Sequence, residues 1–334
     1  MQRRQFVHRT LLSLPVIGLT MPDARTDEGD HRTADSVQDP SEDEPPTEAA
    51  PAWGTPTLGG MQFWGDLHFE GGWKIQRNVL TGHCRLLDPR NYRFASGSLE
   101  ECQRNLRAIN AAGRIPADPQ HMVILCHGIG RSSKSFSTMA GAMRQQGYGV
   151  VPFEYPSTRV PLESSCLYLD SLIKSLSNAK RIDFVVHSMG GLLVRMMLRE
   201  CGSDPRFERM IMLGTPNQGA EMADMLKTNY AYRLIYGPAG QQLVSDSEGL
   251  ISKLPAPSFS FGIVAGGKGD NQGFNPLLPG DDDGTVTVES CRLAGAADFM
   301  VVNRIHSFLM RDPAVIAATL RFLRNARFAE DPND

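Results

Sequence analysis

The sequence has few of the residues that build metal, disulfide or cofactor sites. Its 334 residues include six cysteines, which are scattered and form neither a CxxC pair nor the Cys/His spacing of zinc ligands. This pattern argues against a zinc site and against a dense disulfide framework. Cys126 lies within an apolar run and is expected to be a buried thiol. No dinucleotide-binding fingerprint is present either.

A strong charge of one sign is also missing. The chain carries 34 Lys and Arg against 37 Asp and Glu, for a net charge of -3, without a long basic run or a basic and aromatic stripe. The sequence therefore gives no indication of nucleic-acid binding. Its hydrophobic content of 41% and charged content of 21% are those of a soluble globular protein with one large α/β domain or two smaller ones.

The apolar stretch near the N-terminus is too short to cross a bilayer as an ordinary helix. It covers residues 11–21 and is accompanied by Arg3, Arg4 and Arg9, which predicts an export signal over residues 1–22. The R-R-Q-F-V segment that begins at Arg3 resembles a twin-arginine signal, which implies a periplasmic or secreted protein. No clean A-x-A cleavage site follows, so the alternative is a retained anchor and contact with a membrane surface.

The next segments differ sharply in composition. Residues 23–58 are rich in Asp, Glu, Pro, Thr and Ser, which predicts a disordered linker. Residues 59–115 are expected to form a β-rich extension followed by a helix. Aromatic and β-branched residues that alternate with polar ones predict short strands or a hairpin over residues 60–88. Ser98 is the expected N-cap of the helix, and Gly113 its stop.

Residues 116–330 alternate between strand and helix patterns, which predicts an α/β fold with a mostly parallel central sheet and helices on both faces. An interruption at residues 217–257 predicts a small cap insertion over a site at the strand ends. The expected strands are residues 122–126, 149–153, 181–186, 207–213, 259–265 and 299–302, and the expected helices are residues 132–146, 162–177, 189–201 and 313–322.

The H-S-M-G-G segment around Ser188 lies between a predicted strand and a predicted helix. A sharp turn at this place would raise the Ser188 hydroxyl above the sheet, and it requires small residues where strand and helix crowd, which explains Gly190 and Gly191. This is the setting of a nucleophile elbow, although Val186 occupies the first glycine position of the G-x-S-x-G pattern. An ordinary capped turn is the alternative.

The elbow and its context resemble the α/β-hydrolase superfamily, in its bacterial lipase and esterase branch, over roughly residues 122–322. The resemblance implies an α/β-hydrolase fold and hydrolysis of acyl esters. The H-G-I-G segment at His127 resembles the oxyanion loop of lipases, so the backbone amides of Ile129 and Met189 are the expected oxyanion hole. The G-T-P turn at Gly214 resembles a turn that borders the site in lipases, or is an ordinary Pro/Gly turn.

A serine nucleophile needs a histidine base and a carboxylate, which follow the serine in the order acid, then histidine in this superfamily. His306 is the only histidine after Ser188 and is therefore the expected base. The neighbouring His187 is expected to pack or to hydrogen-bond locally. The D-D-D-G-T-V segment resembles the D-G-x-V segment of bacterial lipases, which selects Asp283 as the acid, with Asp282 as the alternative.

The acidic run also invites comparison with a calcium loop. An EF-hand frame with Gly284 in sixth position would begin at Pro279 and end at Ser290, so that frame fails and only another calcium geometry stays open. The implied triad needs no cofactor, and its substrate would be a small-molecule or lipid ester. The same triad serves acyltransferases and thioesterases, and a non-catalytic binding module on this fold is an alternative of another class.

Overall fold

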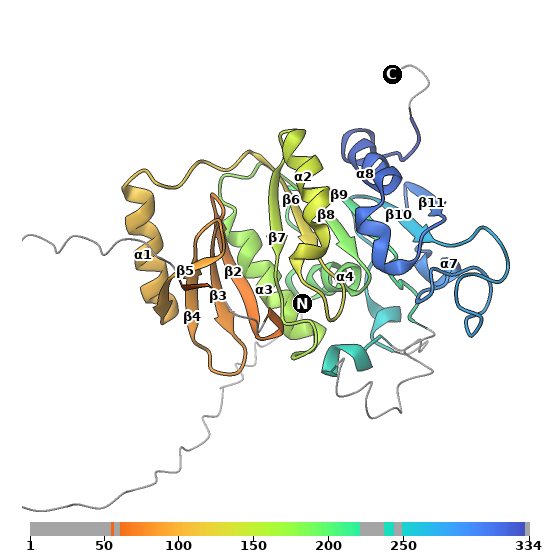
Figure 1. The fold of residues 1–334 in the computed structure, drawn as a ribbon, viewed down its shortest axis with the longest axis horizontal. Helices are drawn as coiled ribbons and strands as arrows, with labels where there is room; N and C mark the ends of the chain where they lie inside the picture. The colour runs from red at the N-terminus through yellow and green to blue at the C-terminus, as the bar shows by residue number, and fades with distance from the viewer. Residues whose placement is uncertain (1–54, 57–60, 221–236, 244–248, 331–334) are drawn as a thin grey trace, which may run out of the picture. The chain divides into compact units, whose positions relative to one another are not determined.

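The computed structural model describes residues 55–56, 61–220, 237–243 and 249–330 (Figure 1). The predicted export signal, almost all of the predicted linker and parts of the predicted cap lie outside the described residues, and with the domain boundaries they stay predictions. Within the described ranges, no helix combines the length and the apolar character needed to cross a membrane.

An antiparallel sheet precedes the α/β region. Its strands lie in the order β1-β5-β4-β3-β2, and the short helix η1 (Met61–Phe63) leads into β2. The strands expected over residues 60–88 are confirmed, whereas β5 was not expected because most of its side chains are exposed and give no clear alternation. The strands are β1 (Thr55–Pro56), β2 (Trp64–Glu70), β3 (Trp73–Asn78), β4 (Cys84–Leu87) and β5 (Tyr92–Gly97).

Helix α1 (Leu99–Ala111) covers this sheet, as predicted. Ser98 Oγ accepts a hydrogen bond from the Glu101 amide at 3.2 Å, and the Glu101 carboxylate accepts one from the Ser98 amide at 2.6 Å. This reciprocal capping box satisfies two amides that the first helical turn would leave unpaired. The buried face of α1 joins the apolar face of β3 and β4 in one small core.

The second sheet has six strands in the order β11-β10-β9-β8-β6-β7, and every neighbouring pair is parallel. Each strand predicted over residues 116–330 is confirmed to within one residue at either end. The strands are β6 (His121–Cys126), β7 (Gly149–Phe153), β8 (Arg181–His187), β9 (Phe207–Leu213), β10 (Ser260–Gly266) and β11 (Asp298–Val302).

Helices cover both faces of this sheet (Figure 1). Side chains alternate along β6, so that Met122 and Ile124 enter one core while Val123 and Leu125 enter the other. Helices α3 (Leu162–Ser175) and α4 (Met189–Cys201) supply the first core, and α2 (Ser137–Gln145) and α8 (Pro313–Asn325) the second. The buried thiol of Cys126 lies in the first core, as expected.

Three local features depart from the predicted elements. The helix expected from residue 132 begins with a tighter turn, η2 (Ser133–Phe136), before α2 starts. Short helices η3 (Ile251–Lys253) and α7 (Val288–Cys291) were not predicted, because segments of three or four residues carry no helical periodicity. His306 does not lie in an open loop but begins the helix η4 (His306–Arg311).

Matched glycine substitutions test how α8 packs on β10. An added Cβ at Gly262 would overlap the buried ring of Phe322 and lie 2.7 Å from Phe328 Cζ, whereas one at Gly141, within α2, meets nothing within 4 Å. We expect Gly262→Ala to lower the free energy of unfolding by about 1–3 kcal/mol. Gly141→Ala should raise it by about 0.5–1 kcal/mol. Chemical denaturation checks both values, and equal effects would contradict the described packing.

Candidate active site

The predicted site residues gather at the carboxyl ends of the parallel strands. Loops follow β6, β8, β9, β10 and β11, and each of these loops contributes a residue discussed below. Because parallel strands end at one edge of the sheet, residues more than a hundred positions apart in sequence meet there.

Ser188 sits in a sharp turn between β8 and α4. Its backbone angles are φ 54° and ψ -126°, a region that non-glycine residues adopt only under strain of about 1–3 kcal/mol. Its amide donates to the carbonyl of Leu213 at 2.9 Å, which ties the turn to the end of β9. The side chain is 8% exposed.

The two glycines after Met189 fit where no side chain could. A Cβ at Gly190 would overlap the carbonyl of Cys126, and one at Gly191 would lie 2.5 Å from Thr215 Cγ2. Helix α4 therefore starts in contact with the ends of β6 and β9. This crowding is what the two glycines in the sequence predict. Val186, in the place of the first glycine of the motif, is fully buried in the core between the sheet and helices α3 and α4.

His306 is paired with Asp283. Nδ1 of the imidazole lies 2.7 Å from Oδ2 of the carboxylate, and the His306 amide donates to the Asp283 carbonyl at 2.8 Å. The other carboxylate oxygen accepts from the amides of Thr285 and Val286 at 3.0 and 2.8 Å. An ionised carboxylate only accepts hydrogen bonds, so Nδ1 carries the proton and Nε2 of the neutral ring carries the lone pair.

Asp282 points elsewhere, although it is also buried. Its carboxylate accepts from the amides of Asn275 and Gly284 at 3.0 and 2.6 Å, and Asp281 accepts from the amides of Lys268 and Gly269 at 2.7 and 2.9 Å. These bonds fix the conformation of the loop that carries Asp283, the aspartate that pairs with His306. Among the described residues, no group of three or more His, Cys, Asp or Glu side chains is arranged to hold a metal ion.

His187 contacts His306, a relation that the sequence did not indicate. The two rings lie 4.5 Å apart between centroids, and His187 Nε2 donates to the His306 carbonyl at 3.1 Å. This bond places the proton of the neutral ring on Nε2, and among the described residues the buried Nδ1 has no hydrogen-bond partner. Burial, together with the adjacent His306, lowers the pKa of His187 well below its usual value.

The loop after β6 closes over the serine turn. A Cβ at Gly128 would lie 3.0 Å from Ser188 Cβ, so only a glycine permits this approach. Within the ranges that the structure describes, the amides of Ile129 and Met189 have no hydrogen-bond acceptor. Two unpaired N–H groups therefore flank the turn at the places where an oxyanion hole is expected.

The turn after β9 supports the histidine. Gly214 has a positive φ of 55°, and a Cβ there would lie 3.0 Å from His306 Nδ1, so the imidazole packs directly on this glycine. Thr215 in turn packs on Gly191. The G-T-P sequence thus borders the candidate site. Gly214 packs against His306, and Thr215 packs against the start of α4.

Arg195, a buried residue of α4, was also missed. Its guanidinium donates to the carbonyls of Asn217 and Leu254 at 3.1 and 2.6 Å and to that of Pro255 at 3.0 Å. These acceptors lie at the two ends of the predicted cap, residues 217–257. Burial lowers the pKa of Arg195 to about 10. An arginine within an apolar helix gave no sequence signal for this role.

No protein-family model matches the chain, and no curated protein matches it in sequence. Many solved structures share its fold. The propeptide form of the Bacillus licheniformis lipase BlEst2 has a TM-score of 0.52 at 20% identity, over 65% of this chain and 52% of that one. The mature form has a TM-score of 0.49 at 20% identity, over 63% and 94%. A hydrolase from Oleispira antarctica has a TM-score of 0.45 at 14% identity, over 62% and 92%.

This chain spans about half the length of the propeptide form of that lipase. An elbow after β8, an acid after β10 and a histidine after β11 follow the order of the α/β hydrolases. The chain therefore has the α/β-hydrolase fold.

Proposed function

We propose that the protein is a serine hydrolase that cleaves carboxylic esters, with a small-molecule or lipid ester as substrate. The observation that carries the proposal is the buried Asp283–His306 pair, 2.7 Å between Oδ2 and Nδ1, beside the strained turn of Ser188. A structural histidine would not need a fully buried carboxylate that is itself held by two backbone amides. The lipase among the structures of the same fold supports an ester as the substrate class.

In the proposed mechanism, Ser188 Oγ attacks the acyl carbonyl while His306 Nε2 accepts the hydroxyl proton. Asp283 holds the imidazole in the tautomer that leaves Nε2 free, and it stabilises the imidazolium that forms. The amides of Ile129 and Met189 donate to the developing oxyanion. His306 then protonates the leaving alcohol, and a water molecule, activated by the same imidazole, releases the acid from the acyl-enzyme.

His187 does not serve as the base in this proposal. Its Nε2 proton is committed to the His306 carbonyl, and its Nδ1 faces Gly128 in a buried space. The bond instead fixes the backbone of the histidine that acts as the base. A neutral His187 also avoids a second positive charge 4.5 Å from the imidazolium that forms on His306.

Labelling by a fluorophosphonate probe tests the nucleophile. The probe should modify the wild type at Ser188, and Ser188→Ala should remove the labelling and lower hydrolysis of p-nitrophenyl esters by about 10⁴- to 10⁶-fold. Ser165→Ala is the matched control, because this serine is buried in α3 and its hydroxyl has no hydrogen-bond partner in the part of the chain that the structure describes. An unlabelled wild type, or equal labelling of Ser188→Ala, would refute the serine-hydrolase proposal.

Substitution of neighbouring aspartates tests the acid. Asp283→Asn should lower kcat by about 10⁴-fold, because an amide that donates toward Nδ1 favours the wrong imidazole tautomer. Asp282→Asn should cost about tenfold or less, since its carboxylate accepts only backbone amides and the amide oxygen can still accept one of them. Steady-state kinetics on both variants decide the assignment, and the reverse ranking would make Asp282 the acid.

The pH dependence of stability tests the state of His187. Its folded pKa is lowered, so the unfolded chain takes up a proton as the pH falls below about 6.5 while the native state does not, and stability is lost in that direction. Between pH 7.5 and 5.5, the wild type should lose about 1.4 kcal/mol more than His187→Gln. Exposed His83→Gln is the control and should follow the wild-type curve. Parallel curves for wild type and His187→Gln would mean that native His187 takes up its proton over the same pH range as the unfolded chain, and would contradict the lowered pKa.

A further inference from the structure

Gln62, in the helix ahead of β2, reaches the loop that follows β6. Its Nε2 donates to the carbonyl of Arg131 at 2.8 Å. Its Oε1 accepts from Ser157 Oγ at 2.8 Å and from the amide and hydroxyl of Thr158, each at 3.1 Å. One side chain of the short helix that leads into the antiparallel sheet thus joins the loops after β6 and β7 of the parallel sheet.

The same contacts continue into the loop that carries Ile129. Ser157 Oγ, which donates to Gln62, accepts from the amide of Gly130 at 3.0 Å. Ser157 is fully buried and Thr158 nearly so. Two peptides of this loop are therefore held through Gln62, the 131–132 peptide directly at the Arg131 carbonyl and the 129–130 peptide through Ser157. The 129–130 peptide directly follows the amide of Ile129.

A second set of hydrogen bonds, here called the sheet anchor, joins β2 and β3 to the end of β7. The Asp66 amide donates to the Glu154 carbonyl at 2.9 Å, and the Glu154 amide donates to the Asp66 side chain, at Oδ2, at 2.8 Å. Lys74 Nζ lies 3.4 Å from the same carboxylate oxygen and donates to the Pro152 carbonyl at 2.5 Å. Burial raises the pKa of Asp66, against the opposing charge of Lys74.

The sheet anchor also contacts the loop after β6, through Glu154. Glu154 Oε2 lies 3.4 Å from His127 Nε2, without the alignment of a hydrogen bond, while Nδ1 of His127 donates to the Gly128 carbonyl at 2.8 Å. Burial raises the pKa of Glu154, but the neighbouring His127, Lys74 and Ser133 lower it more, so the carboxylate form is favoured. A charged group of the sheet junction thus faces the first residue of the loop.

We infer that Gln62, which precedes the antiparallel sheet, is a positioning residue that aims the Ile129 amide at the oxyanion. The inference rests on the proposed function, because it gives a role to a residue outside the triad and the oxyanion donors. Amides stabilise a transition state only when they are already aimed at the place where charge develops. The contacts of Gln62 hold this loop at Arg131 and, through Ser157, at Gly130, next to the Ile129 amide.

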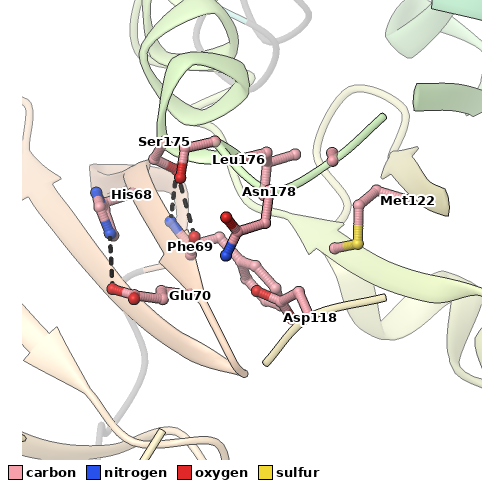
Figure 2. A pocket seen from close by; sticks show the side chains of 10 residues that line it. His68, Phe69, Glu70, Asp118, Met122, Ser175, Leu176 and Asn178 are labelled. Atoms are coloured by element: carbon pink, nitrogen blue, oxygen red, sulfur yellow. Dashed lines mark hydrogen bonds and ion pairs between the residues drawn. The ribbon is translucent and has the colours of Figure 1, made fainter. Parts of the chain in front are cut away.

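The opposite end of β2 supplies a control. There Ser175 Oγ accepts from the Phe69 amide at 3.0 Å, which joins β2 to the end of α3 beside a small pocket of about 100 Å³ (Figure 2). This pocket lies at the amino ends of β6 and β8, whereas Ser188 follows the carboxyl end of β8. Ser175→Ala therefore weakens the attachment of the same sheet without touching the loop of Ile129.

The test compares Gln62→Ala, Gln62→Glu and Ser175→Ala in the full chain. Gln62→Ala should lower kcat roughly 10- to 100-fold with KM nearly unchanged, because the loss falls on the transition state. Ser188 Oγ adds to a trifluoromethyl ketone, which forms a C–O bond and an oxyanion while His306 takes the proton. The affinity for this ketone should fall by the same factor as kcat. Gln62→Glu keeps the acceptor for Ser157 and Thr158 but loses the donor to Arg131, and should show an intermediate loss.

Ser175→Ala should keep the kcat and the ketone affinity of the wild type even where its melting temperature falls. Wild-type kcat and ketone affinity in Gln62→Ala would overturn the inference, as would a parallel loss in Ser175→Ala. If Gln62→Ala does not fold, Gln62→Glu decides by the same two readouts. Fluorophosphonate labelling of the wild type at Ser188 is measured alongside, so that a failure of the proposed function is recognised separately from a failure of this inference.

Discussion

Crowding at the carboxyl end of β8 is the constraint on which the site depends. The backbone of Ser188 holds a positive φ only because β6, β9 and α4 meet at this point with no room for larger residues. Gly190 touches the end of β6, and Gly191 touches Thr215 after β9. The same meeting of strands brings Gly214 against His306, so one packing arrangement sets the position of both the proposed nucleophile and the proposed base.

The sequence predicted most of the fold because its elements have strong local signals. A continuous apolar run marks β6, and Ser98 with Glu101 marks the start of α1. The residues of the proposed triad could also be predicted, since Ser188 has a motif and His306 is the only later histidine. The choice of Asp283 over Asp282 depended on a resemblance, and the structure pairs Asp283 with the histidine.

The supporting residues could not be predicted in the same way. His187, Gly214 and Gln62 act through contacts with residues 119, 92 and 69 positions away in sequence. A single histidine, glycine or glutamine has no period and no motif, and only the packed sheets reveal its partner. The mostly exposed strand β5 and the short helix η4 were missed for a related reason, because their form is set by neighbours rather than by their own pattern.

His306 follows β11, the edge strand beside β10, and this position has a consequence for folding. Both β10 and β11 must dock on the sheet before the proposed base can reach the proposed nucleophile, which follows β8. Until that docking step, a partly folded molecule contains the serine without its proposed proton acceptor. On the proposed function, hydrolytic activity would then report that this edge of the sheet has formed.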